Sequence, residues 1–157
     1  MNEKQERTLV TGGAVIRDGA GCLLLQQRSD YGAWGLPGGG MEPGETIEQT
    51  MRREVLEETG LEVTDCSLLG IYTGPRMRYE YPDGGRVVFV MFIFEAKVDL
   101  DGKLEEDGRT LRFRDTENES LRLEFRAPAD ITLEEISSVQ RPVFEDLRSG
   151  RSDVLRT

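Results

Sequence analysis

Apolar residues occur along the chain in short runs separated by polar or glycine-rich segments. The runs at residues 9–16 and 22–27 flank a turn-like segment, residues 18–21, and this pattern predicts two strands joined in a hairpin. Residues 68–73 predict another strand. The run at residues 87–96 is apolar at consecutive positions, which predicts a central strand of a sheet with both faces covered.

A last strand is predicted at residues 120–125, where Leu121, Leu123 and Phe125 alternate with polar residues at the period of two that half-buried strands show. Before it, residues 99–118 are polar and weakly periodic. These strands, together with two helical segments, predict a single α+β domain over residues 1–157.

The first predicted helix covers residues 46–59. Thr46 and Gln49 form a capping-box pattern at its start, and Gly60 suits the position after its end. One face has the helical spacing of a core-facing stripe, at Ile47, Met51 and Val55.

The second predicted helix covers residues 137–148, with Pro142 near its first turn, where proline is tolerated. Residues 30–43 and 75–85 predict loops. In the second loop, Tyr79 and Tyr81 alternate with Glu80, which also allows a hairpin strand.

Composition narrows the range of functions. The length of 157 residues is close to the usual ~100–150 for one domain, and a formal charge of −10 argues against sequence-independent nucleic-acid binding, which needs a basic surface. The absence of histidine excludes a histidine base, a histidine-containing triad and a histidine zinc site.

Cys22 and Cys66 are expected to be buried free thiols. Without an apolar run of ~20 residues or an apolar leader, no membrane helix is predicted and a cytoplasmic location is expected.

Three carboxylates share one face of the first predicted helix: Glu54, Glu57 and Glu58. Like charges at this spacing cost a helix ~0.2–0.5 kcal/mol each, and the last helical turn disfavours anions. Mg²⁺ prefers oxygen ligands and would relieve this repulsion. The alternative is an acidic, solvated helix face.

A glycine-rich segment, residues 36–40, precedes this helix. Glycine permits close approach of the backbone to a ligand, so this segment is expected to interrupt regular structure and to present backbone groups to a metal or a phosphate. A plain turn is the alternative.

These residues resemble the signature of the Nudix hydrolases. The family pattern is glycine, five residues, glutamate, seven residues, Arg-Glu, an aliphatic residue, one residue, Glu-Glu, one residue, glycine and an aliphatic residue. This chain matches every defined position, with Gly39, Glu45, Arg53, Glu54, Val55, Glu57, Glu58, Gly60 and Leu61. The resemblance implies an α/β/α sandwich with a mixed β-sheet and the helix of the signature beside it.

The resemblance also implies an activity. Nudix hydrolases cleave a phosphoanhydride in a nucleoside diphosphate linked to another moiety, with Mg²⁺ or Mn²⁺ as cofactor. The implied partner is a small-molecule nucleotide, and a homodimer is possible. ADP-ribose is slightly favoured as the substrate class; the alternative is a nucleoside triphosphate or 8-oxo-dGTP. Two other classes stay open: a non-catalytic nucleotide sensor, and an interaction protein whose acidic face binds a basic partner.

The resemblance and ligand chemistry together suggest roles for individual residues. Glu57 and Glu58 are the expected metal ligands, and Glu54 is a ligand or the group that accepts a proton from water. Gly39 is expected to offer its carbonyl oxygen. Arg53 is expected to hold a glutamate in place through its two-pronged guanidinium group; the alternative is a surface cation.

Further roles are expected outside this cluster. Glu45 supports the loop or reaches the metal through water. The family often has another catalytic carboxylate outside the signature, and Glu119 is the candidate here, in competition with Glu117 and Glu105.

Substrate contacts are expected from residues with aromatic or cationic side chains. Trp34 and Tyr79, with Tyr81, could stack on a base, although Trp34 fits a core position equally well. Arg76 and Arg78 could bind a terminal phosphate or a ribose.

Overall fold

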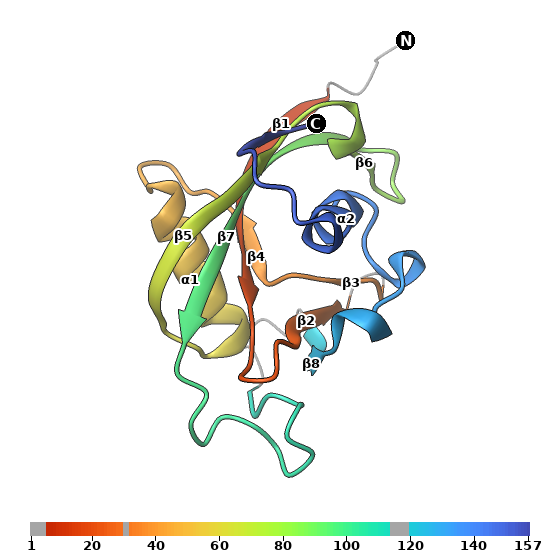
Figure 1. The fold of residues 1–157 in the computed structure, drawn as a ribbon. Helices are drawn as coiled ribbons and strands as arrows, with labels where there is room; N and C mark the ends of the chain where they lie inside the picture. Colours follow the sequence, from red (N-terminus) through yellow and green to blue (C-terminus); the bar gives the residue numbers. More distant parts are fainter. Residues whose placement is uncertain (1–5, 30–31, 114–119) are drawn as a thin grey trace.

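The computed structural model describes residues 6–29, 32–113 and 120–157, and within these ranges the chain forms β-strands, two α-helices and short 3₁₀ turns (Figure 1). The strands are β1 (Arg7–Ile16), β2 (Leu23–Arg28), β3 (Trp34–Gly35), β4 (Gly38–Gly40), β5 (Val63–Tyr72), β6 (Arg78–Glu80), β7 (Arg86–Val98), β8 (Ser120–Arg126) and β9 (Leu155–Arg156). The helices are α1 (Ile47–Thr59) and α2 (Arg141–Ser149). The 3₁₀ turns are Pro75–Met77, Pro128–Asp130 and Leu133–Glu135.

The larger sheet is mixed and has the strand order β4-β1-β7-β5-β9, with β6 also paired to β7. Strand β7 runs parallel to β1 and antiparallel to β5. Its consecutive apolar residues therefore belong to a central strand, as the sequence predicts. Figure 1 shows α1 and α2 on opposite faces of this sheet, which confirms the expected α+β sandwich.

The predicted hairpin between the first two strands is wrong. The turn is present, with Asp18 Oδ1 accepting hydrogen bonds from the backbone N–H groups of Ala20 and Cys22. However, β2 joins β3 and β8 in a separate three-stranded sheet, and only the bridge between Arg17 and Leu23 connects it to the end of β1 in the described residues. Strand β7 pairs with one edge of β1 along its whole length, β4 pairs with the other edge at Thr11–Gly13, and β2 pairs with β8 instead.

Helix α1 has the predicted caps. The Thr46 hydroxyl accepts a bond from the Gln49 backbone N–H, the Gln49 amide oxygen accepts one from the Thr46 N–H, and Gly60 ends the helix in the left-handed conformation at φ 71°. The apolar stripe packs on the sheet, where Met51 and Val55 are completely buried. This core also contains Ala14, Ile16, Phe94 and Ala96.

Helix α2 begins at Arg141, later than the predicted residue 137, because residues 137–140 form a turn. Pro142 lies in the first turn, as expected. Val143 and Phe144 pack with Tyr72 and Ile93 in a second core on the opposite face of the sheet.

The glycine-rich segment is more regular than the sequence suggests. Gly38–Gly40 pair with β1 as strand β4, and Trp34–Gly35 pair with β2 as strand β3. Glycine makes this pairing possible, because a Cβ on Gly38 would lie 2.5 Å from the Gly12 carbonyl oxygen. Interstrand contacts therefore impose a strand on a sequence without strand propensity.

The tyrosine-containing loop also contains a strand. Arg78–Glu80 pairs with β7, and Tyr81 closes the connecting turn with two backbone hydrogen bonds to Gly84 and Gly85.

Cys22 and Cys66 are free thiols, as expected, but both are only partly buried. Neither helix in the described ranges has the length and hydropathy needed to cross a membrane.

Candidate active site

Two glutamates of α1 contact the glycines of β4 directly. Glu58 is buried, and its Oε2 accepts a hydrogen bond of 2.9 Å from the Gly38 backbone N–H. Glu54 packs against Gly39, where a Cβ would lie only 2.4 Å from the Glu54 carboxyl carbon. The backbone of the β4 glycines thus packs directly against these two carboxylates.

Arg53 connects the carboxylates to the loop before the helix. Its Nε and Nη2 donate to the two carboxylate oxygens of Glu45 at 2.8 and 3.0 Å, a forked pairing. Nη2 also donates to the Gly40 carbonyl oxygen at 2.9 Å, and Nη1 donates to Glu54 Oε1 at 2.8 Å. Arg53 therefore ties the loop, strand β4 and Glu54 together.

This pairing changes the ionisation of both Arg53 and Glu45. The hydrogen bonds from Arg53 are the main cause that lowers the pKa of Glu45 to about 2. Reciprocally, Glu45 and then Glu54 raise the pKa of Arg53, against an opposing effect of burial. Both groups thus keep their charges throughout the neutral range.

Glu57 differs from the other two glutamates of the helix because its side chain is 53% exposed. Its Oε2 lies 3.4 Å from Arg53 Nη1. In this conformation the described residues contain no cluster of three acidic, cysteine or histidine side chains ready to hold a metal ion. Glu57 therefore differs from the buried Glu58 in that its carboxylate lies in solvent beside Arg53.

The donor groups nevertheless fit a hard divalent cation. Glu54, Glu57 and Glu58 offer only oxygen atoms, which Mg²⁺ and Mn²⁺ prefer. The space that a Cβ on Gly39 would fill is taken by the Glu54 carboxylate, so the backbone of β4 and this acid group lie side by side. Gly39 is thereby placed where its backbone can take part in such a site.

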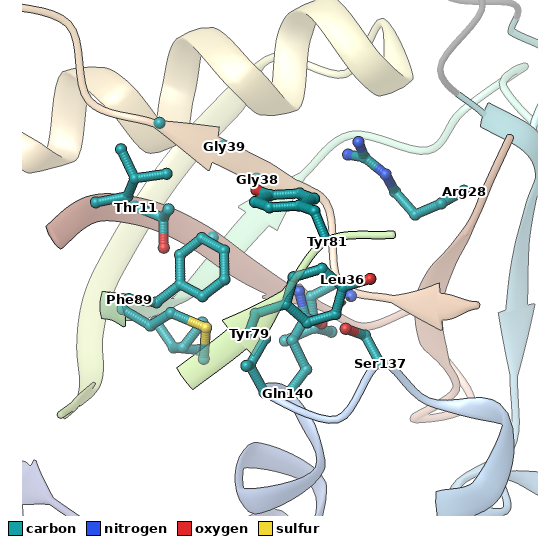
Figure 2. Close-up of a pocket in the computed structure, with 17 residues that line it drawn as sticks. Thr11, Arg28, Leu36, Gly38, Gly39, Tyr79, Tyr81, Phe89, Ser137 and Gln140 are labelled. Atoms are coloured by element: carbon teal, nitrogen blue, oxygen red, sulfur yellow. Dashed lines mark hydrogen bonds between the residues drawn. The ribbon is translucent and has the colours of Figure 1, made fainter. Parts of the chain in front are cut away.

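A cavity of about 260 Å³ adjoins the same glycine strand. Its walls come from β1, β2, β4, β6, β7 and the turn before α2, and Gly38–Gly40 line it. Figure 2 shows the rings of Tyr79, Tyr81 and Phe89 gathered over it. The two tyrosine rings meet edge to face, with centroids 5.0 Å apart and an interplanar angle of 82°.

The expected substrate-contacting residues separate into two groups. Tyr79 lines the cavity. Trp34 is 9% exposed and belongs to the core, where the Arg126 guanidinium carbon lies 4.4 Å from its ring centroid. Arg76 bonds to Glu145 and the Thr157 carbonyl, and Arg78 pairs with Glu6 at 3.0 Å. Neither arginine is among the residues that line the cavity.

The expected carboxylate outside the signature is not placed by the structure. Glu119 and its competitor Glu117 lie outside the described residues. Glu105 forms an exposed ion pair with Arg112 at 3.3 Å.

Several cavity residues were missed by the sequence analysis: Arg28, Phe89, Ser137 and Gln140. They come from β2, β7 and the turn before α2, and no local motif connects them. Gln140 lies 104 residues from Leu36, whose backbone N–H donates to its Oε1 at 2.7 Å. Only the tertiary fold brings these residues to one place.

A family model for the NUDIX domain matches residues 7–147, which is most of the chain. The chain belongs to the Nudix hydrolase family. Among curated proteins, this member is 33% identical to an ADP-ribose pyrophosphatase of Methanocaldococcus jannaschii over 109 residues, 68% of this chain and 60% of that protein. It is also 41% identical to a putative 8-oxo-dGTP diphosphatase of Bacillus subtilis over 74 residues, 46% of this chain and 50% of the other. The chain thus spans about half to 60% of the length of these Nudix relatives.

Solved structures show the same Nudix fold. A NUDIX hydrolase from Nitrosomonas europaea superposes with a TM-score of 0.67 at 25% identity, covering 93% of this chain and 92% of the other. A MutT protein from Methanosarcina mazei gives a TM-score of 0.65 at 20% identity, with 95% and 99% coverage. The second likeness concerns the fold alone.

Proposed function

We propose that this protein is a Mg²⁺- or Mn²⁺-dependent pyrophosphohydrolase that cleaves a phosphoanhydride in a nucleoside diphosphate linked to another moiety. The main support is one observation: Glu54 and Glu58 contact the glycines of β4, and these same glycines line the cavity. Acid groups and a cavity of about 260 Å³ therefore contact the same strand. Membership of the family supports a hydrolase of phosphoanhydrides.

In this proposal Glu54, Glu57 and Glu58 hold the cation, with Gly39 as a backbone contributor. When bound, the ion would lower the pKa of a water molecule and neutralise charge on phosphoryl oxygens. Arg53 fixes Glu54 and the loop, and it is a positioning residue. The glycines of β4 leave room for a polyphosphate to approach the backbone. The alternative role for Glu54, in place of holding the cation, is to accept the proton of the attacking water on a carboxylate oxygen.

Two substrate classes are candidates for this active site. The sequence-based preference for ADP-ribose agrees with the name of the Methanocaldococcus relative, whereas other relatives are named for 8-oxo-dGTP or nucleoside triphosphates. A nucleoside triphosphate is therefore the second candidate substrate. A cytoplasmic location, a homodimer and a catalytic role for Glu119 stay predictions.

The test is hydrolysis with Mg²⁺, and separately Mn²⁺, of ADP-ribose, nucleotide sugars, dinucleoside polyphosphates, nucleoside triphosphates and 8-oxo-dGTP. Product identification and kcat/KM would rank the substrates. Cleavage that stops with chelator is the expected result. Nucleotide binding without turnover would favour a sensor, and neither binding nor turnover would favour the acidic interaction protein.

A further inference from the structure

Thr50 is a buried polar residue one helical turn before Glu54. Its side chain is completely enclosed by the protein. The hydroxyl oxygen lies 3.1 Å from Glu45 Oε1 and 3.3 Å from the carbonyl oxygen of Thr46, four residues earlier in the chain. A hydroxyl group has one proton to donate, so these two acceptors compete for it.

The charge on Glu45 decides this competition. The Thr46 carbonyl oxygen already accepts the Thr50 backbone N–H at 3.0 Å. The pKa of Glu45 is lowered to about 2, chiefly by Arg53, so its carboxylate is ionised at neutral pH. A hydrogen bond to an ionised acceptor is stronger than one to a neutral carbonyl. The Thr50 hydroxyl therefore donates to Glu45 and ties helix α1 to the loop before it.

This bond differs from the other bonds to Glu45 in what stands behind the donor. Glu45 Oε1 also accepts from the Glu42 backbone N–H at 2.8 Å and from Arg53 Nη2 at 3.0 Å. The first of these donors belongs to a loop and the second to the end of a long side chain. Thr50 is β-branched and buried, and such a side chain has few rotamers in a helix. It thus gives Glu45 a fixed point on the helix.

The part of α1 that carries Thr50 is itself held against the sheet. A Cβ on Gly12 of β1 would lie 3.2 Å from the Ile47 carbonyl oxygen and 3.3 Å from the Met51 backbone nitrogen. Helix and strand approach closely here because Gly12 has no side chain. The hydroxyl of Thr50 is therefore presented from a turn that cannot shift without disturbing this contact.

Arg53 transmits the position of Glu45 to Glu54. Its Nε and Nη2 both donate to Glu45, and Nη1 of the same guanidinium donates to Glu54 Oε1 at 2.8 Å. Because the guanidinium is planar and rigid, holding one side of it in place also sets the direction of Nη1. Thr50 is not among the residues that line the cavity, so its influence on the site passes through this chain of bonds.

We propose that Thr50 is a positioning residue for Glu54. Its hydroxyl fixes Glu45, Glu45 fixes Arg53, and the result is a higher affinity of the acidic groups for a divalent cation. The proposal rests on the proposed function and adds to it a residue that the family signature does not define. The competing interpretation is that the hydroxyl only bonds back to the helix carbonyl of Thr46, a contact that threonines in helices often make.

The first comparison is between Thr50→Val, which removes the hydroxyl, and Thr50→Ser, which keeps it. Binding of Mn²⁺ is followed by the electron paramagnetic resonance signal of the free ion, and kcat and KM are measured at a fixed Mn²⁺ concentration. In Thr50→Val the Kd for Mn²⁺ should rise and kcat should fall, each about tenfold, the lower end of the effect of outer-shell partners of a metal. KM should change by less than about twofold, because Thr50 does not line the cavity. Thr50→Ser should restore most of both values.

The second comparison decides which acceptor matters. When Glu45→Ala is present, Thr50→Val should change the Kd for Mn²⁺ by less than about twofold, because the acceptor is already gone. Thr59→Val is the matched control: the Thr59 hydroxyl is also buried and donates to the carbonyl oxygen four residues earlier, that of Val55, at 2.6 Å. Its effect on Mn²⁺ affinity should be the same with and without Glu45.

Wild-type Mn²⁺ affinity in Thr50→Val would overturn the inference, as would an equal loss in Thr50→Val and Thr50→Ser, or a loss in Thr50→Val that Glu45→Ala leaves unchanged. Comparing Thr50→Val with Thr50→Ser needs no change at Glu45, so a folding defect in Glu45→Ala does not remove the test. Mn²⁺ binding that depends on the hydroxyl, without hydrolysis of any substrate, would support the positioning role and refute the proposed activity. Hydrolysis at the wild-type rate by Thr50→Val would do the reverse, and a wild type that binds no Mn²⁺ would overturn both.

Discussion

Three glutamates that look equivalent in the sequence have different surroundings in the structure. Glu58 is buried and accepts a hydrogen bond from the Gly38 N–H. Glu54 lies between Arg53 and Gly39 and contacts both, and the Glu57 side chain is mostly exposed to solvent. Contacts with the protein thus hold Glu54 and Glu58 in place, whereas the Glu57 carboxylate lies mostly in solvent.

Replacing Glu57 or Glu58 by glutamine should reduce kcat/KM by at least about 100-fold, since even outer-shell partners of a metal commonly contribute 10–100-fold. In Glu57→Gln the free energy of unfolding should change by less than about 0.5 kcal/mol or rise, because like-charge repulsion on the helix is relieved. Glu58→Gln should lower it by about 1–3 kcal/mol at most, because Glu58 is buried and its charge strengthens the hydrogen bond from the Gly38 N–H. Steady-state kinetics, Mn²⁺ titration and urea unfolding would measure this. Glu48→Gln, on the first turn of the same helix, is the control; normal turnover by both site variants would refute the assignment.

Gly39→Ala tests the contact between β4 and Glu54. The added methyl group would collide with the Glu54 carboxylate, the movable end of a flexible side chain. We therefore expect Gly39→Ala to affect catalysis more than stability. The free energy of unfolding should fall by ~1–3 kcal/mol at most. The value of kcat/KM should fall much further than it does in Gly40→Ala.

Gly40→Ala is the matched comparison, since its Cβ would meet no atom within 4 Å. Hydrolysis rates and chemical unfolding of both variants provide the measurement. Equal activity in the two alanine variants would show that the Gly39–Glu54 contact does not matter for the reaction.

At the scale of elements, the loop before α1 is held to the helix by charge rather than by apolar packing. Glu45 accepts two bonds from Arg53, and its Oε1 also accepts a bond from the Glu42 backbone N–H at 2.8 Å. Helix caps at Thr46 and Gly60 define the helix itself. The loop therefore depends on Glu45 remaining ionised.

Acidification should weaken this connection in a defined range. The pKa of Glu45 is lowered from its ordinary 4.5 to about 2, chiefly by Arg53. A lowered carboxyl pKa contributes stability that is present above the unfolded-state value and is lost as pH falls through the folded-state value. Unfolding free energy should thus decline between about pH 4.5 and 2 more steeply in the wild type than in Glu45→Gln.

Urea unfolding at several pH values measures how steeply the free energy of unfolding falls as the pH falls in the wild type and in Glu45→Gln. Because Asp107 and Asp153 also have lowered pKa values, the difference between the two proteins, rather than the wild-type curve alone, reports on Glu45. Identical slopes would mean that the pairing with Arg53 does not stabilise the fold.

At the scale of the whole molecule, the end of the chain is anchored by a buried arginine. Arg156 on β9 is 2% exposed and donates to the Tyr72 hydroxyl at 2.7 Å, and that hydroxyl donates to Asp146 Oδ2 at 2.8 Å. Burial is the main cause that raises the pKa of Tyr72 to about 12, so the hydroxyl stays protonated. This chain of bonds joins β9, β5 and α2, which carries the turn containing Gln140.

Arg156→Met should lower the unfolding free energy by about 3 kcal/mol, because Asp146 then loses a buried cationic partner. Adding Asp146→Asn should cost less than the sum of the single changes, as expected for groups in one network. Urea unfolding of the four proteins measures the coupling. Leu155→Ala, at a side chain that is 73% exposed on the same strand, should change stability by less than about 0.5 kcal/mol. Strict additivity would contradict the network.

The sequence by itself determined the family signature, the capped helix α1 and the central strand β7, because caps, helical spacing and a continuous apolar run are local properties. It could not determine that β4 is a strand, that β2 leaves β1 for another sheet, or that Trp34 is in the core. These features depend on which strands compete for each edge. The cavity has the same origin: Gln140 and Leu36 are distant in sequence, and their hydrogen bond exists only because packing of α2 against the sheet brings them together.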